Sequence, residues 1–125
     1  MSDERTVWWA VTIDSTDPRR LASFWSALLG AVVTEVGADR PGWLRLRPLA
    51  PHGPFINFQP VPEANSGKAR IHLDILVGDL QAGLARVIEL GGSDTGRRDT
   101  LPRGRIAVMR DPEGNEFCLL AGPAH

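Results

Sequence analysis

The sequence has one cysteine, no tyrosine and no surplus of basic residues. A single cysteine excludes an intramolecular disulfide framework and is typical of a reducing compartment. The formal net charge of −1 provides no electrostatic footprint for nucleic acid. No apolar run approaches membrane-spanning length, and the first residues lack the basic and then apolar pattern of a secretion signal. We therefore expect a cytoplasmic protein without nucleic-acid or membrane partners.

The 125 residues are enough for a substantial core but not for two independent ones. Hydrophobic residues make up 42% of the chain and charged residues 23%, as in an ordinary globular protein. The length and composition predict a single domain over residues 1–125.

Two helices are predicted by their caps and by their apolar spacing. Asp17 is a suitable N-cap before Pro18, and Gly30 ends the first helix. Asp79 begins the second helix in the same way, and Gly91 ends it. The helices have apolar stripes of helical spacing, formed in the first by Leu21, Phe24, Trp25, Leu28 and Leu29 and in the second by Leu80, Leu84, Val87, Ile88 and Gly91.

The two halves of the chain have the same order of elements. Strands are expected near 7–14, 31–36, 43–47 and 54–59, and then near 70–77, 93–98, 105–110 and 115–120. Asp111-Pro-Glu-Gly114 predicts a type I turn before the last strand. The fold class is therefore α+β, with two tandem βαβββ modules (about 7–60 and 70–121, linker 61–69) forming curved mixed sheets around a cleft, helices outside.

Alternation within the strands separates two faces. The apolar set, expected to pack under the helices, is Trp9, Val11, Ile13, Leu44, Leu46, Ile56, Phe58, Ile71, Leu73, Ile75, Val77, Phe117 and Leu119. The opposite set mixes aromatic and charged residues: Trp8, Ala10, Thr12, Asp14, Trp43, Arg45, Arg47, Phe55, Asn57, Gln59, His72, Asp74, Leu76, Glu116, Cys118 and Leu120. A solvated face seldom carries so many aromatic and apolar residues, so this set predicts a ligand cleft or a subunit interface.

The pattern resembles the vicinal oxygen chelate superfamily, which includes glyoxalases, bleomycin-resistance proteins and extradiol dioxygenases. The motifs that carry the resemblance are His72-Leu-Asp-Ile-Leu-Val-Gly-Asp79, Asp111-Pro-Glu-Gly-Asn-Glu-Phe-Cys118 and the Asp-capped helix that ends in Leu-Leu-Gly. The match is closest to the glyoxalase-like branch. The resemblance implies the fold over most of the chain, but this scaffold hosts lyases, isomerases, dioxygenases, thiol transferases and antibiotic-sequestering binders.

The resemblance also implies where a divalent metal would bind in the metal-dependent members. Ala10 stands where the first-strand histidine is expected, whereas His72 matches the fifth-strand histidine. The fourth-strand position falls near Asn57 or Gln59, and Cys118 replaces the last-strand glutamate, with Glu116 two residues earlier. The candidate metal ligands are therefore His72, Cys118 and Glu116, with Gln59 as an occasional ligand type.

Each of these functional interpretations has a structural alternative. His72 is either a ligand or a cleft histidine bonded to Asp74 or to backbone, and Cys118 is either a ligand, a nucleophile paired with His72, or a small buried hydrophobe. Arg45 and Arg47 form either an anion clamp or a solvated pair. The basic segment 97–105 is interpreted as a loop that either caps the cleft or is simply solvated.

Two functions remain in competition. The favoured one is a protein without the complete family metal site, and with no cofactor, which binds a small anionic or planar molecule through Trp8, Trp43, Arg45, Arg47, Asn57 and Gln59. His72 and Asp74 would be the catalytic acid/base pair if this protein is an enzyme. The alternative is a divalent-metal lyase, isomerase or dioxygenase that uses Zn, Ni, Mn or Fe. In either case we expect a homodimer, whose interface is a second explanation for Trp8, Trp43 and Phe55.

Overall fold

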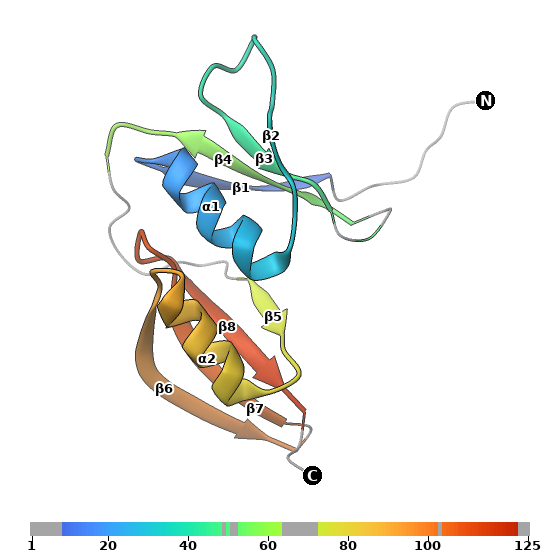
Figure 1. Cartoon of the computed structure of the whole chain (residues 1–125), viewed down its shortest axis with the longest axis vertical. Helices are drawn as coiled ribbons and strands as arrows, with labels where there is room; N and C mark the ends of the chain where they lie inside the picture. The colour runs from blue at the N-terminus through green and yellow to red at the C-terminus, as the bar shows by residue number, and fades with distance from the viewer. Residues whose placement is uncertain (1–8, 49, 51–52, 64–72, 103, 123–125) are drawn as a thin grey trace, which may run out of the picture. The chain divides into compact units, whose positions relative to one another are not determined.

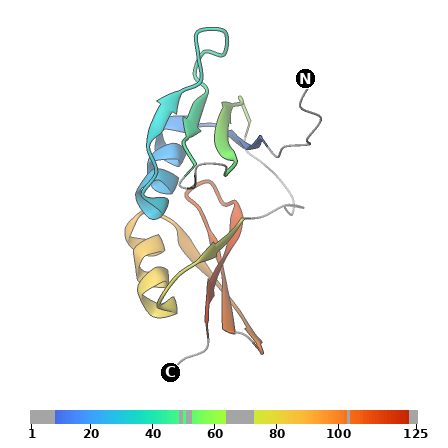
Figure 2. The ribbon, with the colours of Figure 1, turned by 90° about the vertical axis from the view of Figure 1, so that its right-hand side faces the viewer.

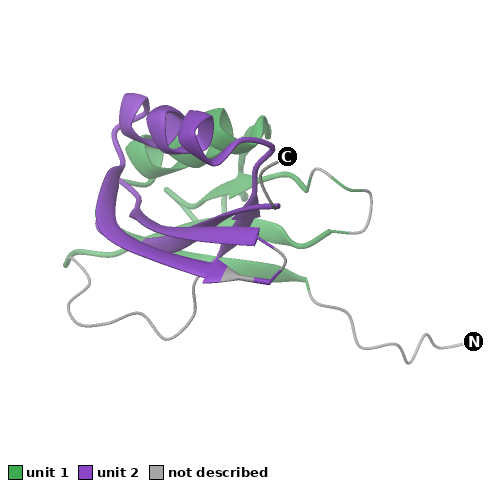
Figure 3. Cartoon of the chain, turned by 90° about the horizontal axis from the view of Figure 1, so that it is seen from below, with its two compact units in different colours: residues 1–63 green, residues 64–125 purple. Residues whose placement is uncertain are grey.

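The computed structural model describes residues 9–48, 50, 53–63, 73–102 and 104–122 (Figure 1). The chain divides into two compact units, residues 1–63 and 64–125 (Figure 3). Each described unit contains one helix and a four-stranded mixed sheet, so the predicted α+β fold with two tandem βαβββ modules is confirmed. Neither helix in the described ranges is both long and apolar enough to cross a membrane.

Unit 1 contains β1 (Ala10–Ser15), α1 (Pro18–Leu29), β2 (Val33–Glu35), β3 (Leu44–Leu46) and β4 (Phe55–Pro60). The strand order is β1-β4-β3-β2. β1 is parallel to β4, whereas β2, β3 and β4 are antiparallel neighbours. The crossover through α1 makes the parallel pair, and the remaining strands follow as a meander.

Unit 2 contains β5 (Asp74–Leu76), α2 (Leu80–Glu89), β6 (Ser93–Leu101), β7 (Gly104–Arg110) and β8 (Glu116–Ala121). The order β5-β8-β7-β6, with β5 parallel to β8, repeats that of unit 1. Within each unit the helix covers one face of its own sheet, as Figure 2 shows.

The helix ends follow from local chemistry. The Asp17 carboxylate accepts a hydrogen bond from the Arg20 amide at 3.3 Å, and Asp79 accepts one from the Gln81 amide at 3.0 Å. Gly30 ends α1 in the left-handed conformation, at φ +69°, where residues with a side chain are disfavoured. Both predicted N-caps are therefore confirmed.

Each unit has its own apolar core beneath its helix. In unit 1, Trp25 is buried as expected, together with Leu21 and Phe24 of α1 and with Leu46 and Phe58 of the sheet. The unit 2 core is formed by Val87, Ala107, Met109, Phe117 and Leu119. These side chains alternate along the strands, so the opposite face of each sheet is left for other residues.

Two large hydrophobic residues assigned to the cores are exposed. Trp9 is 62% exposed, because β1 begins only at Ala10 and strand alternation does not fix the direction of the residue before it. Ile88 is 54% exposed, because it lies about 100° around the helix from Val87, away from the stripe that Leu80, Leu84 and Val87 form.

The segment 97–105 was expected to be a loop, and this expectation is wrong. β6 continues to Leu101, which pairs with Gly104 at the start of β7. The register shifts between Asp94 and Arg98, so the ladder is irregular there. The pairing with β7 therefore overrides the local polar composition.

The turn at residues 111–114 forms as predicted. The Gly114 amide donates to the Asp111 carbonyl at 2.9 Å, and Gly114 has φ +85°. The buried Asp111 carboxylate accepts hydrogen bonds from the amides of Glu113 and Asn115 at 2.9 and 3.0 Å. This turn fixes the register of β7 and β8, and with it the position of Cys118.

Candidate functional site

The face of the unit 1 sheet that points away from α1 carries several of the predicted ligand-binding residues. Arg45 on β3 is directly opposite Asn57 on β4, which in turn is opposite Thr12 on β1. Gln59 follows two residues along β4, opposite Asp14. Because residues at this spacing share a face, the sheet presents a row of polar side chains.

Arg45 is held in place by two neighbours. Its Nε donates a 2.7 Å hydrogen bond to Asn57 Oδ1, and its guanidinium lies 4.5 Å above the centre of the Phe55 ring. Asn57 is only 6% exposed, so Arg45 satisfies a buried amide oxygen. Within the described ranges, neither Nη group of Arg45 donates a hydrogen bond. An oriented guanidinium with two available Nη groups suits bidentate binding of a carboxylate or phosphate.

Phe55 is itself braced by Trp9. The two rings meet edge to face, with centroids 4.9 Å apart and planes at 61°. Trp9, Phe55 and Arg45 thus form a continuous stack, which we call the Arg45 platform. The sequence placed Trp9 on the wrong face, and no spacing rule signals its contact with Phe55.

The other predicted ligand-binding residues lie around this platform or away from it. Arg47 is exposed and follows the end of β3, and Gln59 is half-buried. Trp43 precedes β3, and its described ring contact is with Arg40, whose guanidinium lies 4.8 Å from the ring centre. A role for Trp43 beside Arg45 therefore stays a prediction. Trp8 lies outside the described residues.

In unit 2 the equivalent face carries Asp74, Cys118 and Glu116. Asp74 on β5 is directly opposite Cys118 on β8. Burial raises the pKa of the Cys118 thiol, and the charge of the Asp74 carboxylate and its hydrogen bond with the thiol raise it further. The thiol is therefore protonated at neutral pH, which is unfavourable for a nucleophile.

Glu116 already has two cationic neighbours. Its carboxylate oxygens lie 3.5 Å from Arg97 Nη1 and 3.5 Å from Arg110 Nη2. A metal ion at Glu116 would compete with both arginines.

The predicted metal site and acid/base pair both depend on His72, which lies outside the described residues. Among the described residues no group of three or more His, Cys, Asp or Glu side chains is placed to hold a metal ion. The roles assigned to His72, Asp74, Glu116 and Cys118 therefore stay predictions.

The described residues form two mixed sheets, each built from one βαβββ unit, and the strand order is the same in both. This is the architecture of two tandem modules that the sequence motifs predicted. The family model of the glyoxalase-like domain matches residues 10–120, so the chain belongs to the glyoxalase-like family.

Solved structures share this fold at low sequence identity. A glyoxalase/bleomycin resistance protein/dioxygenase family enzyme from Burkholderia phytofirmans PsJN is 18% identical with a TM-score of 0.75, covering 94% of this chain and 100% of that one. TnmS3, an antibiotic binding protein from Streptomyces sp. CB03234, is 18% identical with a TM-score of 0.67, covering 98% and 100%. The oxidase ChaP-H2 is 19% identical with a TM-score of 0.68, covering 97% and 96%. No curated protein matches the sequence.

Proposed function

We propose that this glyoxalase-like protein binds a small planar or anionic molecule on the unit 1 sheet, and that Arg45 holds the acidic group of the ligand. The observation that carries this proposal is the Arg45 platform. The guanidinium is fixed by Asn57 and Phe55, while its Nη groups bond to none of the described residues. A group that is oriented before binding loses little conformational freedom when the ligand arrives.

The ligand chemistry follows from the groups around the platform. A carboxylate or phosphate would accept two parallel hydrogen bonds from the Nη groups of Arg45. The amide of Gln59 and the guanidinium of Arg47 would bind further polar groups of the ligand, and Trp8 and Trp43 would contact a planar body. The antibiotic binding protein TnmS3, which has the same fold, supports a binding role on such a scaffold.

Calorimetric titration of planar carboxylates and phosphates against Arg45 variants tests the proposal. For a ligand found by screening, Arg45→Ala should weaken binding on the order of 10- to 100-fold, because a charged hydrogen-bonding group is lost. Arg45→Lys should restore only part of the affinity, because lysine lacks the planar fork. Arg105→Ala, which removes an exposed arginine of unit 2, is the matched control. Equal affinity in wild type and Arg45→Ala would overturn the proposal.

The competing function is a divalent-metal lyase, isomerase or dioxygenase. The fold shared with the oxidase ChaP-H2 supports an enzymatic role on this scaffold. Elemental analysis of protein purified without a polyhistidine tag, after dialysis against Zn²⁺, Ni²⁺, Mn²⁺ or Fe²⁺, separates the two. About one ion per chain that is lost in His72→Ala would favour the metal enzyme. Binding that is unchanged by EDTA and lost in Arg45→Ala would favour the metal-independent binder. Light scattering of the same samples tests the predicted homodimer.

A further inference from the structure

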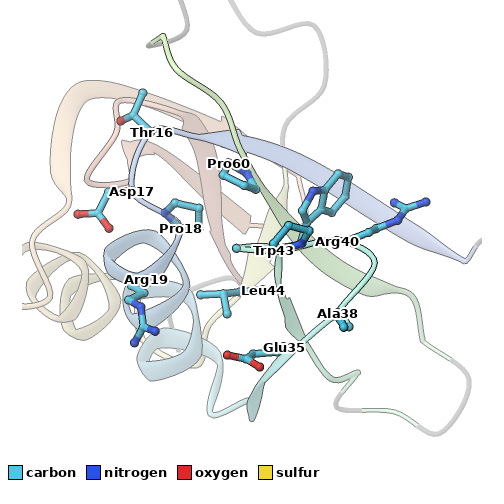
Figure 4. A pocket seen from close by; sticks show the side chains of 13 residues that line it. Thr16, Asp17, Pro18, Arg19, Glu35, Ala38, Arg40, Trp43, Leu44 and Pro60 are labelled. Carbon is cyan, nitrogen blue, oxygen red and sulfur yellow. The ribbon is translucent and has the colours of Figure 1, made fainter.

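A second candidate site lies at one end of the unit 1 sheet, apart from the Arg45 platform. It is a pocket of about 600 Å³ between the start of α1, the β2–β3 hairpin and the end of β4 (Figure 4). Its size is in the range of small-molecule sites, on the order of 300–1,000 Å³. The side chains that decide its chemistry are those of Asp17, Arg19, Glu35, Arg40, Trp43 and Pro60.

The pocket already contains one cation on an aromatic ring. The guanidinium of Arg40 lies 4.8 Å from the centre of the Trp43 ring, as expected where an indole face attracts positive charge. Figure 4 shows Pro60 beside Trp43, so apolar surface adjoins this position. Arg40 thus marks where a ligand cation would be stabilised.

Arg40 is able to leave this position without a change in the main chain. Its amide donates to the Gly37 carbonyl at 3.1 Å, and the Trp43 amide donates to the Arg40 carbonyl at 3.2 Å, so two turns fix the backbone. The Arg40 residue is exposed to solvent. Rotation of this side chain is therefore sufficient to uncover the Trp43 ring.

The charges of the pocket favour a cationic replacement. Two carboxylates, Asp17 and Glu35, and two guanidinium groups, Arg19 and Arg40, line it, so the wall is neutral while Arg40 is in place. When Arg40 swings out, the remaining lining carries one excess negative charge. Glu35 forms no ion pair with any described residue, so its carboxylate is available as a counter-ion.

We propose that this pocket binds a small organic cation, an ammonium or guanidinium group on an apolar body, which replaces Arg40 over the Trp43 ring. The carboxylates of the lining, Asp17 and Glu35, attract the cationic group electrostatically, and Pro18, Leu44 and Pro60 contact the apolar body. Trp43 is named for both ligands, whereas the charged groups differ, Arg45 for the anion and Arg40 and Glu35 for the cation. Variants of Arg40 and Glu35 therefore test this site separately from Arg45.

Titration of the whole protein with benzyltrimethylammonium, followed by the amide NMR signals of Ala38 and Gly42, tests this site. Benzyl alcohol and benzoate serve as neutral and anionic probes of similar size. The cation should give saturable shifts and bind more tightly than either of the other probes. Arg40→Ala should strengthen its binding about two- to fivefold, because the competing cation–π contact is removed. Glu35→Gln should weaken binding, and Trp43→Phe should weaken it less than Trp43→Leu.

Matched variants separate the pocket from general charge effects. Arg105→Ala and Glu63→Gln make the same changes of net charge at exposed positions that do not line the pocket, and neither should alter the binding of the cation. Tighter binding of benzoate than of benzyltrimethylammonium in Arg45→Ala protein, followed at Ala38 and Gly42, would overturn the proposal. So would weaker cation binding in Arg40→Ala, or the absence of saturable shifts in both the wild type and Arg40→Ala. Each of these results leaves the Arg45 experiment unaffected.

Discussion

Cys118 and Asp74 face each other across parallel strands of unit 2, and this arrangement determines the reactivity of the thiol. Burial disfavours the thiolate, and the Asp74 carboxylate adds charge repulsion and a hydrogen bond that is lost on ionisation, so the pKa of the thiol is raised. Arg97 acts in the opposite direction but is outweighed. These effects favour the protonated thiol over an activated thiolate.

We expect Cys118 to react slowly with iodoacetamide at pH 8, because only the thiolate attacks and the pKa of this thiol is raised. Asp74→Asn should speed alkylation and shift its pH profile to lower pH, since the repelling charge is removed. Mass spectrometry of timed samples measures the rate. Asp39→Asn, in the hairpin of unit 1, is the control for net charge. A rate in Asp74→Asn equal to that of the wild type would show that Asp74 does not influence the thiol.

The Asp94–Arg98 ion pair makes the stability of the protein depend on pH. Arg98 Nη1 and Nη2 donate to the two Asp94 carboxylate oxygens at 2.9 and 2.6 Å, and Gly96 donates its amide at 2.8 Å. The bond from Arg98 and then the bond from Gly96 lower the pKa of Asp94 to about 2. A carboxyl group with a depressed folded-state pKa stabilises the fold above its unfolded value near 3.8, and this contribution is lost as the pH falls through about 2.

Asp94→Asn should therefore lower the free energy of unfolding at pH 6 by about 0.5–1 kcal/mol, the value of a partly exposed ion pair. Near pH 2 the difference from wild type should shrink towards zero, because the wild-type carboxylate is then becoming protonated. Urea unfolding at both pH values measures the change. Asp99→Asn alters a carboxylate of the same strand that has no partner among the described residues, and should have little effect. If Asp94→Asn lowered the free energy of unfolding equally at both pH values, the charge of the Asp94 carboxylate would not be the cause of the stabilisation.

At the scale of elements, the start of β7 lies so close to the end of β8 that position 104 requires a glycine. A Cβ atom on Gly104 would lie 2.0 Å from the carbonyl oxygen of Ala121 and 3.1 Å from Gly122 Cα. Because these neighbours are main-chain atoms, a side chain at position 104 would fit only if one of the two strands shifted. A Cβ atom on Gly78, before α2, would meet no atom within 4 Å, and the φ value of Gly78 is not positive.

Gly104→Ala should lower the free energy of unfolding by about 1–3 kcal/mol, as in other overpacked sites. Gly78→Ala should cause no loss of stability, because its methyl group meets open space. Thermal and urea unfolding of both variants measure this contrast within one unit. Equal stability of the two variants would mean that the β7 and β8 ends separate readily.

The elements that the sequence predicted well are those with a local cause. Asp17 and Asp79 begin helices through their own carboxylates, and the turn at Asp111 and Gly114 is fixed within a few residues. The length of β6 was missed because it depends on pairing with β7 across the hairpin rather than on the polar residues of the segment itself. Tertiary pairing decides such boundaries.

The same distinction applies to the candidate sites. Strand alternation placed Arg45 and Asn57 on one face, and the structure joins them by a hydrogen bond. The contacts of Trp9 with Phe55 and of Arg40 with Trp43 could not be predicted in this way. They depend on side-chain rotamers and on the path of a hairpin, which leave no periodic pattern in the sequence.

For the whole molecule, the repeated architecture means that each unit has its own cap, crossover and core. Asp17 and Asp79 perform the same task, since each carboxylate accepts a backbone amide at the start of the only helix described in its unit. Their hydrogen bonds involve no common residue. Independent sites contribute to stability additively, to within about 0.5 kcal/mol.

Asp17→Ala and Asp79→Ala should each lower the free energy of unfolding by about 1 kcal/mol, the usual value of an N-cap. The double variant should lose about 2 kcal/mol, which a protein with a stability of roughly 5–15 kcal/mol tolerates. Urea unfolding followed by far-UV circular dichroism measures all three, and Asp99→Ala provides a control outside the helices. A loss in the double variant that differs from the sum by clearly more than the additive range would show that the two caps are energetically coupled, so that the repeated units do not contribute to folding as independent terms.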